Sequence, residues 1–198
     1  MPRPFPVAIA GFVGVALNLV AVFALREVPH TYAPGDVPAW LAETRAHPTA
    51  STISAAAFVF GLVALAAFVA GLTASLRSSC ATVRAALFGS GALLDAAGCV
   101  APIAALHVDD SAGVALLWVS LLLDSAFNGL LGLGLVCFAL SDTLPRALRW
   151  LALVAGLASL PVALQFSDDL FARLLAIAGP LWLTWLVATG VWLLRRKT

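Results

Sequence analysis

The chain has 198 residues, of which 62% are hydrophobic and 11% are charged, with a net charge of +1 and a mean hydropathy of +1.03. A soluble domain has about 45–50% apolar and about 25% charged residues, and a domain of this size leaves much of its surface exposed. The composition therefore excludes a water-soluble globular protein, and the near-neutral charge without a basic patch argues against nucleic acid as a partner.

Six apolar stretches follow one another along the chain, and each can cross a hydrocarbon core that requires about 20 helical residues. They are far longer than the strands of a membrane barrel and show no alternation with a period of two. The predicted fold class is therefore all-α, a polytopic transmembrane bundle of six helices that forms a single membrane domain over 1–198. The predicted spans are 5–25, 52–75, 83–106, 113–140, 147–165 and 170–194.

The first span predicts an uncleaved helix, because its apolar run is longer than the about 7–15 residues of a signal peptide. An outer loop over 26–50 follows and contains four prolines, so most of it is not regular helix. Within it, Asp36 is placed to cap a short helical turn. Trp40 and Leu41 would then rest on the outer membrane interface, or the loop would form an ordered cap over the bundle.

The distribution of basic residues predicts the orientation. With the N-terminus inside, three basic residues fall outside and eight fall on the cytoplasmic side, which follows the positive-inside rule. The sequence thus predicts a multi-pass protein of a bacterial cytoplasmic membrane, with both termini inside and the lipid bilayer as its partner. The outer residues are Arg26, Arg45 and Arg173; the inner ones are Arg3, Arg77, Arg84, Arg146, Arg149, Arg195, Arg196 and Lys197.

Two carboxylates mark the interior. Asp95 and Asp124 lie near mid-depth of the third and fourth spans, and the short connection 107–111 makes these helices antiparallel neighbours. The two side chains are therefore expected at the same level, where each carboxylate costs at least about 2.5–3.5 kcal/mol and no basic residue lies nearby. If they face each other, they could share a proton and serve in proton exchange or acid–base catalysis.

Helical spacing supports an inward orientation for these residues. Asp95 shares one face with Gly91, Gly98 and Cys99, and polar or small residues likewise line one face of the first and fourth spans. The sequence predicts a polar centre made of Asn18, Asp95, Asp124, Ser125 and Asn128. In it, Asn18, Ser125 and Asn128 are candidate binding residues. The alternative is a purely structural role, in which neutral carboxyls and amides hydrogen-bond the bundle together.

Prolines suggest where the helices are irregular. Pro102, Pro161 and Pro180 fall in the outer halves of their spans, and each removes one backbone hydrogen bond. Gly179-Pro180 is the predicted break. Irregular backbone within a membrane is tolerated where it faces protein or a watery cavity, so an outward-facing vestibule is plausible, although simple kinks explain the prolines equally well.

The sequence predicts neither a metal site nor a cofactor. Only the outer histidines His30, His47 and His107, with Asp109 and Asp110, offer metal ligands, and they show no ligand spacing. Phosphate-loop, HExxH, GxSxG and CxxCH motifs do not occur in the sequence.

The overall plan resembles a broad group of small six-helix bacterial membrane proteins, most of them uncharacterised. The carrying features are the first span, the loop that ends in Trp40-Leu41-Ala42-Glu43, and the acidic residue of Gly91-Ala92-Leu93-Leu94-Asp95. The resemblance implies a fold and a membrane location, and it implies no activity.

Three functional hypotheses remain open. The first is binding or proton-linked transport of a lipophilic small molecule, in a cavity that opens outward beneath the loop 26–50; a 20.4 kDa transporter is small, so this hypothesis predicts a homodimer. The second is an intramembrane enzyme acting on a lipid or isoprenoid, with Asp95 and Asp124 as acid and base. The third is a non-catalytic subunit that packs through Gly129, Gly132 and Gly134.

Overall fold

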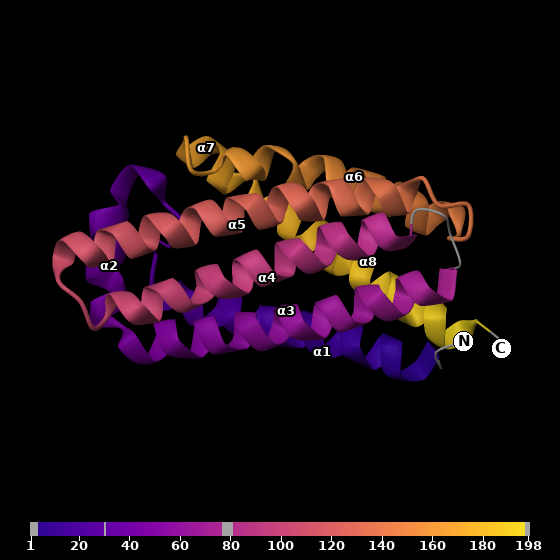
Figure 1. Ribbon diagram of the computed structural model, residues 1–198, viewed down its shortest axis with the longest axis horizontal. Coiled ribbons are helices and arrows are strands. Elements are labelled where there is room, and N and C mark those ends of the chain that lie inside the picture. Colours follow the sequence, from indigo (N-terminus) through magenta and orange to yellow (C-terminus); the bar gives the residue numbers. More distant parts are fainter. Residues whose placement is uncertain (1–3, 30, 77–80, 197–198) are drawn as a thin grey trace.

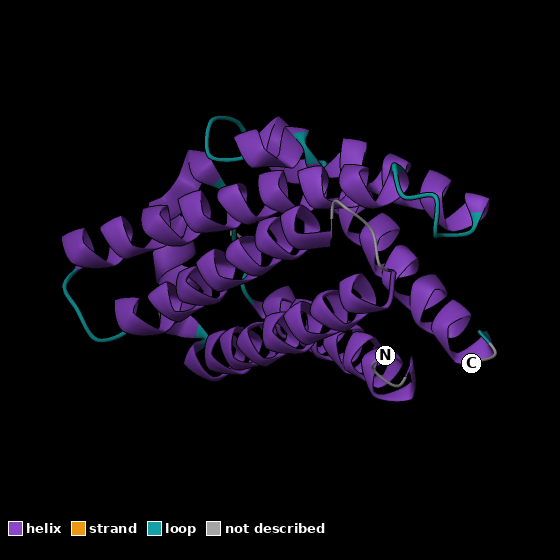
Figure 2. Ribbon diagram, turned by 45° about the vertical axis from the view of Figure 1, so that its right-hand side comes forward, coloured by secondary structure: helices purple, strands orange, loops and turns teal. Residues whose placement is uncertain are grey.

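The computed structural model describes residues 4–29, 31–76 and 81–196. Arg3, His30, Arg77 and Lys197, which entered the predictions above, lie outside the described residues. All regular structure in the described part of the chain is helical (Figure 1, Figure 2), which confirms the all-α bundle. The elements are α1 (Pro4–Ala24), η1 (Leu25–Glu27), η2 (Pro34–Asp36), α2 (Val37–Ala46), α3 (Pro48–Leu76), α4 (Ala81–Ala105), α5 (Asp110–Ala139), α6 (Arg146–Ser159), η3 (Pro161–Leu164), α7 (Asp169–Arg173) and α8 (Leu175–Arg195).

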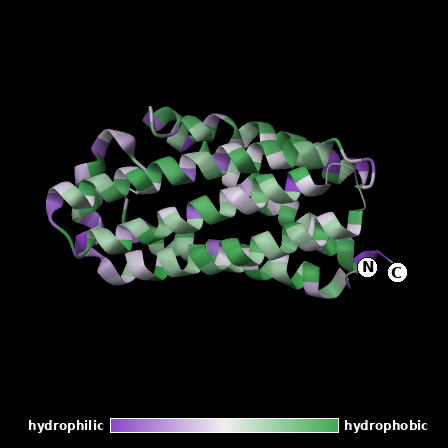
Figure 3. Ribbon diagram, viewed as in Figure 1, coloured by the Kyte–Doolittle hydropathy of each residue, from purple (hydrophilic) through white to green (hydrophobic). Residues whose placement is uncertain are grey.

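Six helices or helix pairs are long and apolar enough to cross a membrane, and they cover the six predicted spans. The ends differ by no more than four residues; α3, for example, begins at Pro48 instead of residue 52. Large apolar side chains face outward along them, including Phe60 at 66% and Leu93 at 74% exposure. Figure 3 shows polar residues gathered mainly toward the two ends of the bundle and apolar residues along its length. The protein is a multi-pass membrane protein, because only a bilayer accommodates such a surface.

The six spans form a ring. Helix α1 packs on α3, α3 on α4, α4 on α5, α5 on α6, α6 on α8, and α8 returns to α1. Helix α1 begins and α8 ends at the same end of the bundle, called here the terminal end, and α2 lies at the opposite end, the cap end (Figure 1). Toward the terminal end, aromatic rings fill the centre of the ring, with Trp185 5.1 Å from Phe138 and 6.5 Å from Phe68 between ring centroids.

Glycines allow a close contact between α5 and α6. A methyl group added at Gly156 would lie 2.8 Å from the backbone oxygen of Gly132, and one added at Gly132 would lie 2.9 Å from the oxygen of Gly156. Only a residue without Cβ permits this approach. The contact holds η3, which continues α6, against α5.

The cap end is built from the segment 26–50. The prediction that most of this segment is not regular helix is wrong, because α2 and the start of α3 account for more than half of it, with its prolines at or near helix starts. As predicted, the Asp36 side chain caps α2 by accepting a hydrogen bond from the Ala39 N–H at 3.1 Å. The placement of Trp40 and Leu41 at the membrane interface is wrong, because both are buried, at 1% and 4% exposure, against α5 and its neighbours. The alternative of an ordered cap holds, since burying these two side chains against the bundle removes more apolar surface from water.

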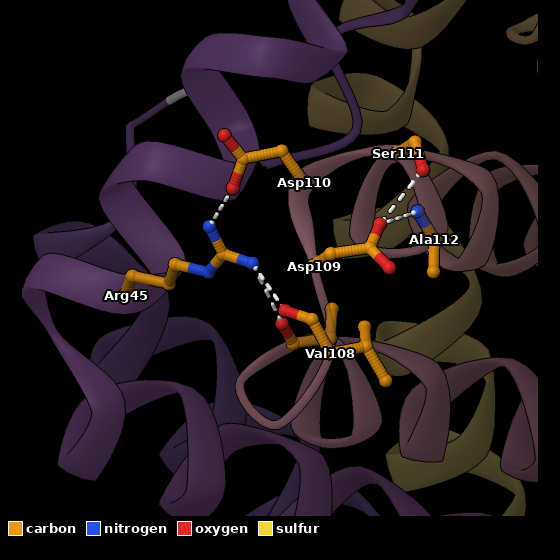
Figure 4. Close-up of polar contacts among 7 residues, drawn as sticks. Arg45, Val108, Asp109, Asp110, Ser111 and Ala112 are labelled. Carbon is orange, nitrogen blue, oxygen red and sulfur yellow. Dashed lines mark hydrogen bonds and ion pairs between the residues drawn. The ribbon is translucent and has the colours of Figure 1, made fainter.

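A polar latch fixes α2 to the hairpin between α4 and α5 (Figure 4). The Arg45 guanidinium pairs with the Asp110 carboxylate and donates to the Val108 carbonyl oxygen at 2.7 Å. Next to it, Asp109 caps α5 by accepting from the Ala112 N–H at 2.9 Å and from the Ser111 hydroxyl at 2.7 Å.

The helix breaks differ from the predicted ones. Helix α8 runs without interruption through Pro180, so the predicted break at Gly179-Pro180 is wrong. The last span is interrupted earlier, at Leu174 between α7 and α8, and the fifth span changes from α6 to the 3-10 helix η3 at Pro161. Proline supplies no N–H, but the helix tolerates it where the preceding turn is held by other contacts.

Candidate functional site

The two carboxylates face each other inside the ring. Asp95 on α4 and Asp124 on α5 are buried, at 4% and 8% exposure, and both line the same cavity. Glycines permit this approach: Gly91 lies opposite Phe127, and Gly98 lies opposite the Ser120 backbone, where an added methyl would stand 3.2 and 3.3 Å away. The antiparallel pairing and the inward stripe that the sequence indicated therefore bring the two groups together.

Hydrogen bonds place the shared proton. The Oδ2 atom of Asp124 accepts from the Asn128 amide at 3.1 Å and from the Gln165 amide. These amide nitrogens can only donate, so they stabilise a negative charge on Asp124. Two neighbouring buried carboxyl groups disfavour a second charge, so a proton on the pair is better held by Asp95, which lacks such amide donors among the described residues. Asp95 receives only a weak contact from the Cys99 thiol, at 3.8 Å.

The pair lies in the wall of a cavity of about 470 Å³. Asp95, Asp124 and Asn128 form its polar floor, while Phe58, Phe127 and Trp182 are among its apolar lining. The remaining wall comes from α1, the Tyr32 segment and the stretch 172–183 of α7 and α8. The site thus combines a buried charge and a proton with an apolar chamber, which is the usual composition of a small-molecule site.

The cavity is bordered by α1 on one side and by α7 and α8 on another. Helices α1 and α8 pack on each other, and α8 runs obliquely across the bundle (Figure 1, Figure 2). The cavity lies between α1 and the first turns of α8. The lining residues Leu19, Val22 and Ala176 are also exposed on the outer surface of the ring. The rim carries Arg173, which is exposed and makes no hydrogen bond or ion pair with any residue that the structure describes.

Tyr32 covers the cavity from the cap end. Its backbone adopts φ 60°, a left-handed conformation that costs a bulky residue about 1–2 kcal/mol, and its ring packs on Trp40 at 5.3 Å between centroids. Burial, together with the nearby Cys99, Asp124 and Asp95, raises the pKa of Tyr32 well above its ordinary value. A phenol is protonated at neutral pH, so Tyr32 adds a neutral hydroxyl to the residues that line the cavity.

The other predicted binding residues are placed differently. Asn18 lines the cavity, but its amide donates to the Gly14 carbonyl oxygen of its own helix at 2.8 Å. Ser125 is buried outside the cavity lining and donates to the Leu121 carbonyl oxygen at 2.7 Å. Of the five predicted residues, Asp95, Asp124 and Asn128 lie together in the cavity wall, and Asn18 lines the cavity as well. Ser125 does not line the cavity and hydrogen-bonds within its own helix.

Three members of the site were missed by sequence reasoning. Gln165 is the last residue of the predicted fifth span. The one hint in the sequence is that a polar amide follows four residues after Pro161. Tyr32 is the only tyrosine of the chain and lay in a proline-rich loop whose path the sequence does not fix. Arg173 was considered only as one of the basic residues predicted on the outer side.

No protein family, curated protein or solved structure matches the chain. The resemblance to small six-helix bacterial membrane proteins stays a prediction. Among the residues that the structure describes, no group of three histidine, cysteine or carboxylate side chains is arranged to hold a metal ion. The function is therefore argued from the cavity and its carboxyl pair.

Proposed function

We propose that this membrane protein binds a lipophilic small molecule in the cavity between α1 and α8 and exchanges a proton with it or with its surroundings at the Asp95–Asp124 pair. The observation that carries the proposal is the pair of buried carboxyl groups in the wall of a largely apolar cavity. A purely structural pair would be better placed in a packed interface, where no space adjoins the charge.

The size and chemistry of the cavity define the ligand class. Its volume of about 470 Å³ lies within the range of about 300–1,000 Å³ of small-molecule sites. A hydroxyl or amine on the ligand would donate to Asp124, and the apolar walls would hold a hydrocarbon body. Arg173 at the rim favours an amphiphile whose other end carries a carboxylate or phosphate. An isoprenoid or lipid with these groups fits the site.

The opening toward the lipid favours entry from the bilayer. The exposed rim residues Leu19, Val22 and Ala176 are apolar, so a lipophilic molecule reaches the floor without crossing water.

The charges favour an orientation with the cap end outside. The terminal end carries Arg146, Arg149, Arg195 and Arg196, and the positive-inside rule assigns such an end to the cytoplasm. Both termini would then lie inside a bacterial cytoplasmic membrane, and the cavity would belong to the outer half of the bilayer. Transport by so small a chain would call for a homodimer.

Filling the cavity tests the proposal. A methyl added at Gly179, which lines the cavity, meets no atom within 4 Å, and the same holds for Gly89 on α4, which does not line it. Gly179→Leu should therefore fold like Gly89→Leu but occupy the ligand space. Mass spectrometry of small molecules extracted from the purified proteins should find the ligand in the wild type and Gly89→Leu, and not in Gly179→Leu. Equal ligand content in both variants would refute the cavity as the binding site.

The division of the carboxyl pair into a protonated Asp95 and a charged Asp124 favours one alternative, an intramembrane acid–base enzyme. Two carboxyls held in different protonation states can act as acid and base on the same substrate. Catalysis predicts turnover in detergent without a gradient, whereas transport predicts proteoliposome flux that depends on a pH gradient. Either activity should be lost in Asp95→Asn. A non-catalytic subunit would show neither activity, and it would copurify with another chain.

A further inference from the structure

A second, much smaller chamber adjoins the site at the cap end. Its volume of about 20 Å³ accommodates about one water molecule. Tyr32 and Phe58 line both the chamber and the large cavity, so the two spaces are neighbours. The other side of the chamber is formed by α2 and the first turns of α3.

Several buried polar side chains lie among the apolar residues that line this chamber. Thr44, Ser51, Ser54 and Cys99 all line it, and each is buried to more than nine-tenths. The Ser51 hydroxyl has no hydrogen-bond partner among the described residues. A buried hydroxyl without a partner is costly, and one water with two to four polar neighbours satisfies it.

The inner side of the chamber leads to the carboxyl pair. Cys99 lines the chamber, and its thiol contacts the Asp95 carboxyl at 3.8 Å. Tyr32 lines it as well. A water in this space therefore lies beside the Cys99 thiol, which contacts the Asp95 carboxyl.

A cluster of one histidine and two glutamates lies close in the chain to two residues of the chamber wall, Thr44 and Ser51. The Ser51 N–H donates to the His47 carbonyl oxygen at 3.0 Å, so His47 lies one helical turn above Ser51. The His47 imidazole is 3.6 Å from the Glu27 carboxylate and 3.8 Å from the Glu43 carboxylate. Glu43 directly precedes Thr44 of the chamber wall on α2. His47, Glu27 and Glu43 are partly exposed and can exchange protons with solvent.

We propose that this chamber holds an ordered water that relays protons between the His47–Glu27–Glu43 cluster and Asp95. In each transfer the water accepts a proton on one lone pair and releases another along a different hydrogen bond, so that it is unchanged. The relay rests on the proposed function, because it supplies the proton that the carboxyl pair exchanges. Protons then reach the carboxyl pair from the cap end, whereas the ligand enters between α1 and α8.

The test is hydrogen–deuterium exchange of the buried carboxyl, followed by infrared spectroscopy of the purified protein after transfer to D₂O. The C=O stretch of protonated Asp95 shifts when its proton is replaced. Ser51→Val removes the hydroxyl and fills the chamber, so we expect this shift to slow by about tenfold or more. Thr52→Val is the matched control, because Thr52 is exposed and donates to the Pro48 carbonyl oxygen instead of lining the chamber.

Cys99 supplies a second pair of variants. Cys99→Val should slow the exchange, and Cys99→Ser should retain the wild-type rate because a hydroxyl can replace the thiol. If Ser51→Val fails to fold, Ser51→Ala removes the hydroxyl without adding volume.

Two results would overturn the relay. One is unchanged exchange in both the Ser51 and the Cys99→Val variants. The other is a wild type without a protonated carboxyl band, which would also contradict the carboxyl pair. Ligand content of the same samples separates the proposals. Slow exchange with normal ligand content supports the relay alone, whereas normal exchange with normal ligand content leaves the ligand site standing and removes the relay.

Discussion

Replacing Gly156 by alanine tests the packing that positions the site. The added methyl would lie 2.8 Å from the Gly132 oxygen and 3.0 Å from the Val136 nitrogen. Both are backbone atoms, which cannot rotate away, so α5 and α6 must separate. This contact matters for the site because η3, and with it the segment that carries Gln165, continues α6 along α5.

The magnitude follows from two opposing terms. Overpacking costs about 1–3 kcal/mol, and alanine gains about 0.5–1 kcal/mol over glycine within a helix. Gly156→Ala should therefore lower the free energy of unfolding by about 1–2 kcal/mol. Gly89→Ala has no atom within 4 Å of the added methyl and should be neutral or stabilising by about 0.5–1 kcal/mol.

The assay is unfolding of the detergent-solubilised protein by sodium dodecyl sulfate, followed by circular dichroism. The two variants should differ by about 1–3 kcal/mol, a factor of about 5 to 150 in the ratio of folded to unfolded protein. If Gly156→Ala were as stable as Gly89→Ala, α5 and α6 would not approach this closely. The placement of Gln165 against Asp124 would then lose its support.

Two further predictions concern protons. In the infrared spectrum, the protonated carboxyl band should disappear in Asp95→Asn and persist in Asp124→Asn, because Asp95 holds the shared proton; the reverse pattern would contradict the hydrogen-bond assignment. At the cap end, the Ala112 N–H and the Ser111 hydroxyl lower the pKa of Asp109. Its stabilising effect is therefore complete above the unfolded value of about 3.9 and is lost as the pH falls below it. Asp109→Asn, which still caps a helix, should show a smaller loss of thermal stability between pH about 6 and pH about 3, and an equal loss would contradict the role of Asp109.

The facing carboxylates could be predicted from the sequence because three local facts agree. The spans have clear lengths, the connection between the third and fourth is short, and glycines share the face of Asp95. Each fact acts within one helix or one hairpin, where period and length determine position. Asn128 followed from the same argument, since it lies one turn after Asp124.

The rest of the site depends on chain paths that no local pattern fixes. Gln165 reaches Asp124 because the chain continues as a 3-10 helix after Pro161, and no local pattern favours this break over one at Pro180. Tyr32 enters the ring through a left-handed backbone conformation that residues other than glycine rarely adopt. Trp40 looked like an interfacial anchor, because amphipathic rings are common there, but it is buried by the tertiary contacts of α2.

The most direct test of the central claim is mass spectrometry of small molecules released from gently purified wild-type protein and from the Asp95→Asn/Asp124→Asn double variant. Loss of one charged hydrogen bond weakens binding by about 1.5–3 kcal/mol, or about ten- to a hundredfold. We expect a specific lipophilic compound with a hydroxyl or amine group in the wild type, and none in a double variant that remains folded. An empty wild type, together with a variant of equal or greater stability, would contradict the account and leave the carboxyl pair as an internal hydrogen bond of the bundle.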